Sequence, residues 1–147
     1  MRGVTDELRD TVTRRLHEQQ QRMTPVRSRL LDVLAATHRP LTITEILEHQ
    51  RDLAQSSVYR NLVVLEQAGV VHRVVTHDEF ARYELTEALT GHHHHLVCSN
   101  CGRVDDLPAS DRLERSVADA VADAAEKIGF RTMHHRLDLV GLCTDCA

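Results

Sequence analysis

Four cysteines in two C-x-x-C units constrain this chain more than any other feature. Cys98 and Cys101 form the first unit, and Cys143 and Cys146 form the second. Four thiolates at this spacing suit a tetrahedral Zn²⁺ that ties the end of the chain to its middle. Protein ligands would fill every position, so we expect structural zinc and no catalysis. A disulfide pair and a redox dithiol are the alternatives; the dithiol needs a C-x-x-C at a helix start, whereas strands are expected around the first unit.

Length and composition narrow the class of protein. The chain has 147 residues, which suits one typical domain or two small ones. It has no run of about 20 apolar residues that could span a membrane, and residues 1–21 are charged, without the apolar core of a signal peptide. We therefore expect a cytoplasmic protein, in which cysteines stay reduced.

The charge is unevenly distributed. The net charge of −4 argues against a nucleic-acid-binding protein when it is taken as an average. Residues 1–85, however, hold 12 arginines against 12 acidic residues, whereas residues 86–147 hold 6 basic against 10 acidic residues. Any contact with DNA is therefore expected in the first half, and it would have to be local.

The first half has the pattern of a winged helix-turn-helix. Apolar periodicity and capping residues predict an amphipathic helix followed by a trio of helices and two strands, over residues 5–21, 24–37, 42–50, 57–68, 70–76 and 81–85. Ser56 or Ser57 is expected to cap the last helix, which would be the recognition helix. Its outer face offers Ser56, Tyr59 and Arg60 to bases or phosphates. An ordinary corner of a helical bundle is the alternative interpretation.

The second half predicts a small α+β module. Residues 87–91 are interpreted as a hinge between a domain over residues 1–86 and a domain over residues 92–147. Strands are expected over residues 94–98, 103–107 and 133–140, with a helix over residues 110–128. Such a sheet leaves an edge and an apolar face uncovered, and a second copy of the chain would cover both. We therefore expect a homodimer.

Four consecutive histidines, His92 to His95, precede the first C-x-x-C. Neighbouring side chains on a strand point to opposite faces, so His93 and His95 would share one face, and His92 and His94 the other. Each pair could serve a separate metal site, but two ligands do not hold a metal, so partners are needed. The candidates are Glu84, Glu87, Asp105, Asp106, Glu114, His38, His72, His134 and His135. A solvent-facing polar strand is the alternative.

Several motifs together resemble the ferric uptake regulator family. They are T-P-x-R from Thr24, S-S-V-Y-R-N-L from Ser56, the histidine run continuing into C-S-N-C-G, and the closing G-L-C-T-D-C. The resemblance covers roughly residues 15–147 and is specific only as a combination. It implies a dimeric, metal-dependent transcriptional repressor. In this family a winged helix binds DNA, and metal between the domains sets the dimer to match an inverted-repeat operator.

The resemblance also implies roles for individual residues. The four cysteines match the structural zinc site. Residues of the DNA-binding surface are Arg27 near the backbone, Ser56 and Ser57 in the motif, Tyr59 as a base contact and Arg60 as a phosphate contact. The regulatory interdomain site would combine Glu84, His93, His95 and Asp106 with His38 or His72. A further site inside the dimerisation module would use His92, His94, Glu114 and His135.

Some positions depart from the family pattern. His38 sits a residue or two out of the register of the histidine in iron- and peroxide-sensing members. Zinc-sensing members carry an acidic residue at the position of His72 and a cysteine near Thr86. The interval from Glu84 to the histidines is long, which leaves Glu87 as an alternative ligand. The expected regulatory metal is Zn²⁺ or Fe²⁺, with Mn²⁺ or Ni²⁺ also open. A peroxide sensor, a zinc enzyme and a metal buffer are the alternative functions.

Overall fold

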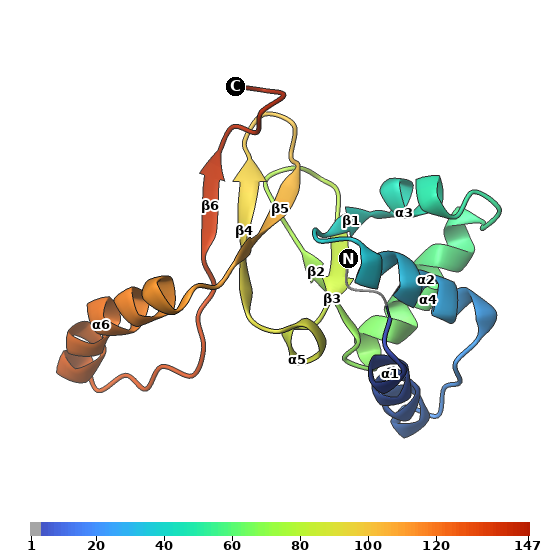
Figure 1. Cartoon of the computed structure of the whole chain (residues 1–147), viewed down its shortest axis with the longest axis horizontal. Helices are drawn as coiled ribbons and strands as arrows, with labels where there is room; N and C mark the ends of the chain where they lie inside the picture. The colour runs from blue at the N-terminus through green and yellow to red at the C-terminus, as the bar shows by residue number, and fades with distance from the viewer. Residues whose placement is uncertain (1–3) are drawn as a thin grey trace.

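A computed structural model describes residues 4–147 (Figure 1). The first three residues of the predicted N-terminal domain lie outside the described residues. Four helices and a three-stranded sheet form the first half of the chain. The second half contains another three-stranded sheet, and the remaining long helix lies in sequence between its last two strands. This arrangement confirms the predicted α+β fold, a winged helix-turn-helix followed by a small α/β module. No helix in residues 4–147 is long and apolar enough to cross a membrane.

The helices of the first half begin where the sequence predicts, with one exception. They are α1 (Asp6–Glu18), α2 (Pro25–Ala36), α3 (Ile43–His49) and α4 (Gln55–Gln67). Thr24 caps α2, and the Thr42–Glu45 capping box starts α3, as expected. The predicted serine cap of α4 is wrong. The cap position is Ala54, which makes no side-chain cap, and both serines already lie in the first helical turn.

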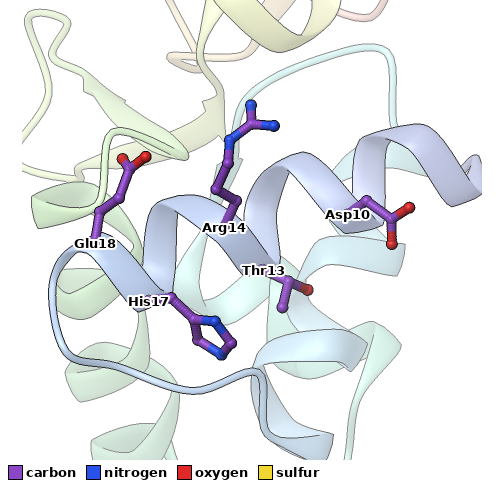
Figure 2. Close-up of a pocket in the computed structure, with 5 residues that line it drawn as sticks. All are labelled: Asp10, Thr13, Arg14, His17 and Glu18. Carbon is purple, nitrogen blue, oxygen red and sulfur yellow. The ribbon is translucent and has the colours of Figure 1, made fainter.

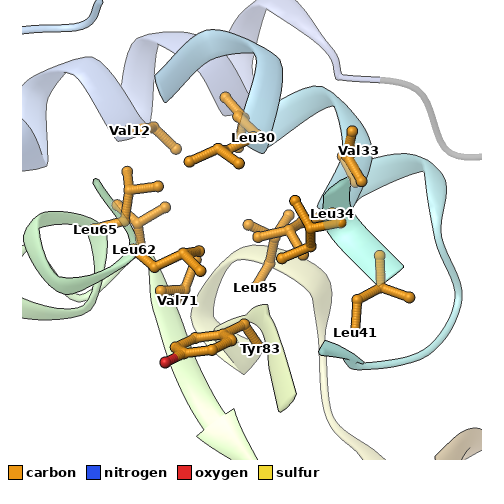
Figure 3. Packing of buried hydrophobic residues seen from close by; sticks show 14 of the residues in the cluster. Val12, Leu30, Val33, Leu34, Leu41, Leu62, Leu65, Val71, Tyr83 and Leu85 are labelled. Carbon is orange, nitrogen blue, oxygen red and sulfur yellow. The ribbon is translucent and has the colours of Figure 1, made fainter. Parts of the chain in front are cut away.

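Aliphatic side chains form the core of this half (Figure 3). Val12 of α1, Leu30 of α2 and Leu62 of α4 are fully buried and meet from three helices. Val71 and Tyr83 close the core from the sheet side. This packing fixes α4 by its inner face and leaves its outer face free for a ligand.

The wing sheet is formed by three antiparallel strands in the order β1-β3-β2. The strands β2 (Val71–Val74) and β3 (Arg82–Leu85) form the predicted hairpin, and His72 pairs with Glu84 across it. The third strand, β1 (Leu41–Thr42), was not predicted, since two residues carry no readable period. We call β2, β3 and the connecting residues 75–81 the wing hairpin.

A single helical turn, α5 (Glu87–Thr90), occupies the predicted hinge. It leads into the second sheet, whose strands follow the order β5-β4-β6. Strand β4 (His93–Cys98) is central, antiparallel to β5 (Val104–Pro108) and parallel to β6 (Asp138–Gly141).

The last predicted strand is shorter than expected. Residues 131–137 have no regular structure, and β6 starts only at Asp138, opposite His95. His135 instead turns toward Glu114 on α6 (Asp111–Ile128), with 2.9 Å between the imidazole and carboxylate atoms. The alternation of polar and apolar residues before Asp138 therefore does not reflect a sheet face.

The apolar face of the C-terminal half is uncovered. Helix α6 lies apart from the helices of the first half (Figure 1) and has no buried residue. Large exposed apolar side chains lie on α6, on β6 and beside them: Val121, Ile128, Phe130, Met133, Leu139, Val140 and Leu142. Surface of this kind on an otherwise well-packed chain marks an interface.

Candidate metal centres and DNA-reading surface

The histidine run is split between two clusters, as the alternation along a strand predicts. One cluster combines Glu84 of β3, His93 and His95 of β4, and Asp106 of β5. Each residue offers one ligand atom, and these atoms all lie within 4.8 Å of one another. We call this group the interdomain cluster, because Glu84 belongs to the wing hairpin and the other three belong to the second sheet.

Glu84 is the centre of the interdomain cluster. Its carboxylate receives three imidazole contacts, from His72 at 3.0 Å, His93 at 3.1 Å and His95 at 2.9 Å. Burial alone would raise the pKa of Glu84, but the hydrogen bonds from the imidazoles outweigh it and hold this pKa well below its usual range. The hydrogen bond to Glu84 correspondingly raises the pKa of His93 to about 9. The site thus places the imidazoles, which can carry positive charge, next to the Glu84 carboxylate.

Asp106 provides the test of whether a metal fits. Burial, together with the negative charge of Glu84, raises the pKa of Asp106 to about 6. Its Oδ1 is buried and, within residues 4–147, has no hydrogen-bond partner. The same atom lies 3.8 Å from His93 Nε2 and 4.0 Å from His95 Nε2. An orphaned carboxylate oxygen facing two imidazole nitrogens and a second carboxylate is a donor set that a divalent cation satisfies.

The other predicted ligands of this site lie around the interdomain cluster. His72 contacts it only through Glu84, and the four clustered ligands do not include it. His38 lies on the wall of a cleft of about 790 Å³ that Glu84, His93 and Asp106 also line. Glu87 is not part of the cluster, because its carboxylate contacts His92 at 3.0 Å.

A second cluster lies within the C-terminal half, on the opposite face of β4. It brings together His92, His94, Glu114 and His135. Glu114 lies at the centre, 3.2 Å from His92, 2.6 Å from His94 and 2.9 Å from His135. His94 is only 1% exposed, and its Nδ1 has no hydrogen-bond partner among the described residues. A carboxylate ringed by imidazoles thus occurs twice, once on each face of the strand.

The four cysteines form the third cluster. Their sulfur atoms lie within 4.8 Å of one another, with 3.8 Å between Cys101 and Cys143. All four are free thiols. Hydrogen bonds from the backbone N–H groups of Cys101 and Cys143 lower the pKa of Cys98 to about 6. For Cys101 and Cys146, hydrogen bonds with Arg103 and Asn100 lower the pKa, but those with the neighbouring thiols outweigh them and raise it. The geometry therefore suits tetrahedral Zn²⁺.

The two remaining ligand candidates are engaged elsewhere or lie at the edge. Asp105 pairs with Arg103 at 2.8 Å. His134 lines a smaller hollow of about 230 Å³ next to both histidine clusters. A separate hollow over α1 is lined by five side chains of that one helix (Figure 2), so it brings no distant groups together.

The outer face of α4 forms the candidate DNA-reading surface. Tyr59 is 53% exposed, and Ser56 and Arg60 are also exposed, whereas Ser57 is half-buried. Arg27 donates from Nε to Asn61 Oδ1 at 3.0 Å and from Nη1 to the Arg22 carbonyl oxygen at 2.6 Å. Arg27 therefore also joins α2 to the recognition helix. Sequence reasoning missed Asn61, because nothing local marks it as the partner of a residue 34 positions away.

These features define a class of protein: a winged helix-turn-helix joined to a sheet that carries clustered histidine, carboxylate and cysteine ligands. The chain belongs to the ferric uptake regulator family, whose model matches residues 18–140. The resemblance found in the sequence is thereby confirmed.

Individual relatives agree with this assignment. The peroxide-responsive repressor PerR of Staphylococcus saprophyticus is 30% identical over 97% of this chain and 93% of its own length. The solved structure of the Vibrio cholerae ferric uptake regulator is 26% identical, with a TM-score of 0.69 over 89% of this chain and 98% of that one. The Helicobacter pylori ferric uptake regulator, at 22% identity, shares the fold with a TM-score of 0.77 over 99% and 96% of the two chains.

Proposed function

We propose that this protein is a metal-dependent transcriptional repressor of metal-homeostasis genes. Residues 1–86 form its DNA-binding domain, residues 87–91 its hinge, and residues 92–147 its dimerisation and metal-binding domain. One observation carries the proposal. Glu84, on the wing hairpin, shares a ligand cluster with three residues of the second sheet.

A site built from both domains couples metal to their arrangement. The ligands of the interdomain cluster meet only when the wing hairpin lies against β4 and β5. A divalent cation therefore binds this arrangement better than one in which the domains are apart, and its binding shifts the population toward it. His72 and His38 lie next to the cluster, where either could complete the coordination.

The other two clusters have different proposed roles. Cys98, Cys101, Cys143 and Cys146 would hold a structural Zn²⁺ that fastens the C-terminal turn to the end of β4. His92, His94, Glu114 and His135 would hold a metal that fastens α6 to β4. The regulatory metal is Zn²⁺ or Fe²⁺, with Mn²⁺ or Ni²⁺ as alternatives, because imidazole and carboxylate ligands suit all four.

A homodimer on an inverted-repeat operator completes the proposal. The exposed apolar side chains of α6 and β6 offer the dimer surface. Each recognition helix would then enter a major groove with Tyr59 directed at bases and Arg60 at phosphates. Ser56, Ser57 and Arg27 would contribute contacts near the backbone.

A titration tests the function. The zinc-containing, otherwise metal-free protein is titrated with Zn²⁺, anaerobic Fe²⁺, Ni²⁺ and Mn²⁺, with the anisotropy of labelled DNA from upstream of its own gene as readout. We expect one ion to switch on DNA binding at a much lower concentration than the others. The titration is repeated with an operator that the protein selects from random DNA. If the affinity for that operator is the same with and without each of the four ions, the proposal is refuted.

Peroxide sensing is a second candidate. Two relatives that are each 30% identical are named a peroxide-responsive repressor, in Staphylococcus saprophyticus, and a peroxide operon regulator, in Bacillus subtilis. The interdomain cluster also contains no thiolate, so a redox response there would have to depend on the metal. Hydrogen peroxide should then release DNA from the Fe²⁺-loaded protein and leave the Zn²⁺-loaded protein bound, since Zn²⁺ has no redox chemistry.

A further inference from the structure

The wing hairpin contacts the second sheet at a place other than the interdomain cluster. Its loop, residues 75–81, reaches across to the turn between Cys98 and β5 (Figure 1). From the hairpin, Arg82 donates to both carboxylate oxygens of Asp78, each at 2.8 Å. Arg82 is only 5% exposed. The pair is bidentate, with Arg82 buried and Asp78 half-buried, which gives it a defined orientation.

Gly102 forms the other side of this contact. A Cβ atom on Gly102 would lie 2.1 Å from Asp78 Oδ2 and 3.0 Å from Arg82 Nη2. Real Cβ atoms do not approach other atoms so closely, so the carboxylate of Asp78 occupies the space that a side chain at position 102 would need. The φ of +78° at Gly102 also favours glycine. The turn itself requires the left-handed conformation of Gly102, whereas the close approach of Asp78 to Gly102 arises from the contact between the domains.

The loop is built to hold Asp78 in this place. Asp78 Oδ1 also accepts from the Thr76 hydroxyl at 3.0 Å and from the Phe80 backbone N–H at 3.2 Å. The pKa of Arg82 is raised mainly by its hydrogen bond to Asp78 and in small part by the negative charge of the nearby Cys101 thiolate. A zinc site with four thiolates carries net negative charge, so a neighbouring guanidinium is favourable there.

We propose that Asp78 and Arg82 are positioning residues, which brace the wing hairpin on Gly102 and so stabilise the arrangement that assembles the interdomain cluster. Arg82 and Glu84 lie two residues apart on the same strand. The contact that fixes Arg82 therefore also fixes where Glu84 meets His93 and His95. The inference rests on the proposed function for the interdomain metal site and for its consequence in DNA binding.

The expected effect follows from linkage. A site that forms only in one arrangement has an apparent affinity reduced by the fraction of molecules in that arrangement. Loss of the contact lowers that fraction, so more metal is needed to fill the interdomain cluster. Coupling between sites commonly changes affinity by about fivefold or more.

The first test compares two wing variants, Asp78→Ser and Glu79→Ser. Both remove one negative charge, but Glu79 is exposed and makes no ion pair or hydrogen bond within residues 4–147. Serine at position 78 can still accept from the Phe80 N–H. Co²⁺ binding to the zinc-containing protein is measured by chelator competition, and a His93→Ala variant identifies the binding phase that belongs to the interdomain cluster. We expect Asp78→Ser to weaken this phase about fivefold or more, and Glu79→Ser to leave it within about twofold.

The second test probes the same contact from the other domain. Gly102→Ala leaves both charged residues unchanged but adds a methyl group that would displace the Asp78 carboxylate from the turn. Gly129→Ala is the matched control, because Gly129 has a φ of +68° and open space where its Cβ would lie. We expect Gly102→Ala, and not Gly129→Ala, to weaken Co²⁺ binding at the interdomain cluster. Zinc content and thermal unfolding are measured on every variant.

A double variant separates the contact from strain in the turn. If the inference holds, Gly102→Ala costs much less affinity in the Asp78→Ser background than in the wild type. Equal costs in the two backgrounds would overturn it, and so would equal affinities of Asp78→Ser and Glu79→Ser. Because Co²⁺ binding is measured without DNA, a wild-type protein that shows no metal-dependent DNA binding refutes the proposed function and leaves this comparison intact.

Discussion

Substituting Glu84 by glutamine tests the interdomain cluster most directly. Glutamine keeps the size of the side chain but removes the charge that faces three imidazoles at 2.9 to 3.1 Å. Glu84 is only 6% exposed, so water does not replace what is lost. A hydrogen bond to a charged group is worth about 1.5–3 kcal/mol. The imidazole contacts are given up when a metal binds, but glutamine offers that metal a neutral amide oxygen in place of a charged carboxylate, so we expect a loss of about that size in the free energy of metal binding.

This loss corresponds to metal binding at the interdomain cluster about 10- to 150-fold weaker than in the wild type. The measurement is Co²⁺ affinity by chelator competition, followed by the metal concentration that gives half-maximal DNA binding. Under the proposed function metal and DNA select the same arrangement of the domains, so both values should move together. The dimer and its zinc should be unchanged, since Glu84 contacts neither the cysteines nor α6.

Glu87→Gln is the matched control. It removes the same charge three residues along the chain, but Glu87 contacts His92 of the other cluster. We expect it to leave the interdomain affinity within about threefold, as for an exposed ion pair. If Glu84→Gln binds metal as well as the wild type, or if Glu87→Gln loses as much, the assignment of Glu84 as the ligand shared between the domains is refuted.

Four further predictions concern DNA contact, zinc, the core and pH. Tyr59→Ala should lower the preference for the operator over other DNA by about 1–3 kcal/mol, whereas Arg60→Ala should mainly reduce the salt dependence of binding, by a slope of about 1; anisotropy at several salt concentrations separates the two. Cys143→Ser should release the structural zinc and destabilise the C-terminal half by about 4 kcal/mol or more, checked by metal analysis and thermal unfolding. Leu62→Ala, at a fully buried position, should cost about 2–5 kcal/mol in chemical denaturation. The hydrogen bonds from Arg82 lower the pKa of Asp78 from 3.8 to about 2. The Asp78 carboxylate therefore stabilises the folded state above pH 3.8, and this contribution is lost as the pH falls toward about 2. The difference in the free energy of unfolding between the wild type and Asp78→Asn should shrink over that interval.

Interactions between residues that are close in the sequence made much of the fold predictable. The threonine caps of α2 and α3 depend on groups within three residues of one another, and the structure contains both. The alternation of side chains along β4 also needs no distant partner. It separates His93 and His95 from His92 and His94, and the two clusters follow that division.

The errors in the prediction arose where a local pattern competed with a distant contact. The serines at the start of α4 are good caps by type, but the backbone at Ala54 already turns into the helix before them. The alternation before Asp138 resembled a strand, yet His135 is directed at Glu114 instead of a neighbouring strand. Two-residue β1 exists only because β3 lies beside it.

The sequence by itself determined which types of side chain form the clusters, how they divide between the faces of one strand, and where the helices of the winged helix-turn-helix lie. Those features follow from covalent spacing and from the geometry of single elements. Only the tertiary structure decided that Glu84 and not Glu87 reaches His93 and His95. It alone placed Asp78 on the backbone of Gly102. Each of these choices depends on how two separate sheets lie against each other, and no short-range pattern in the chain records that arrangement.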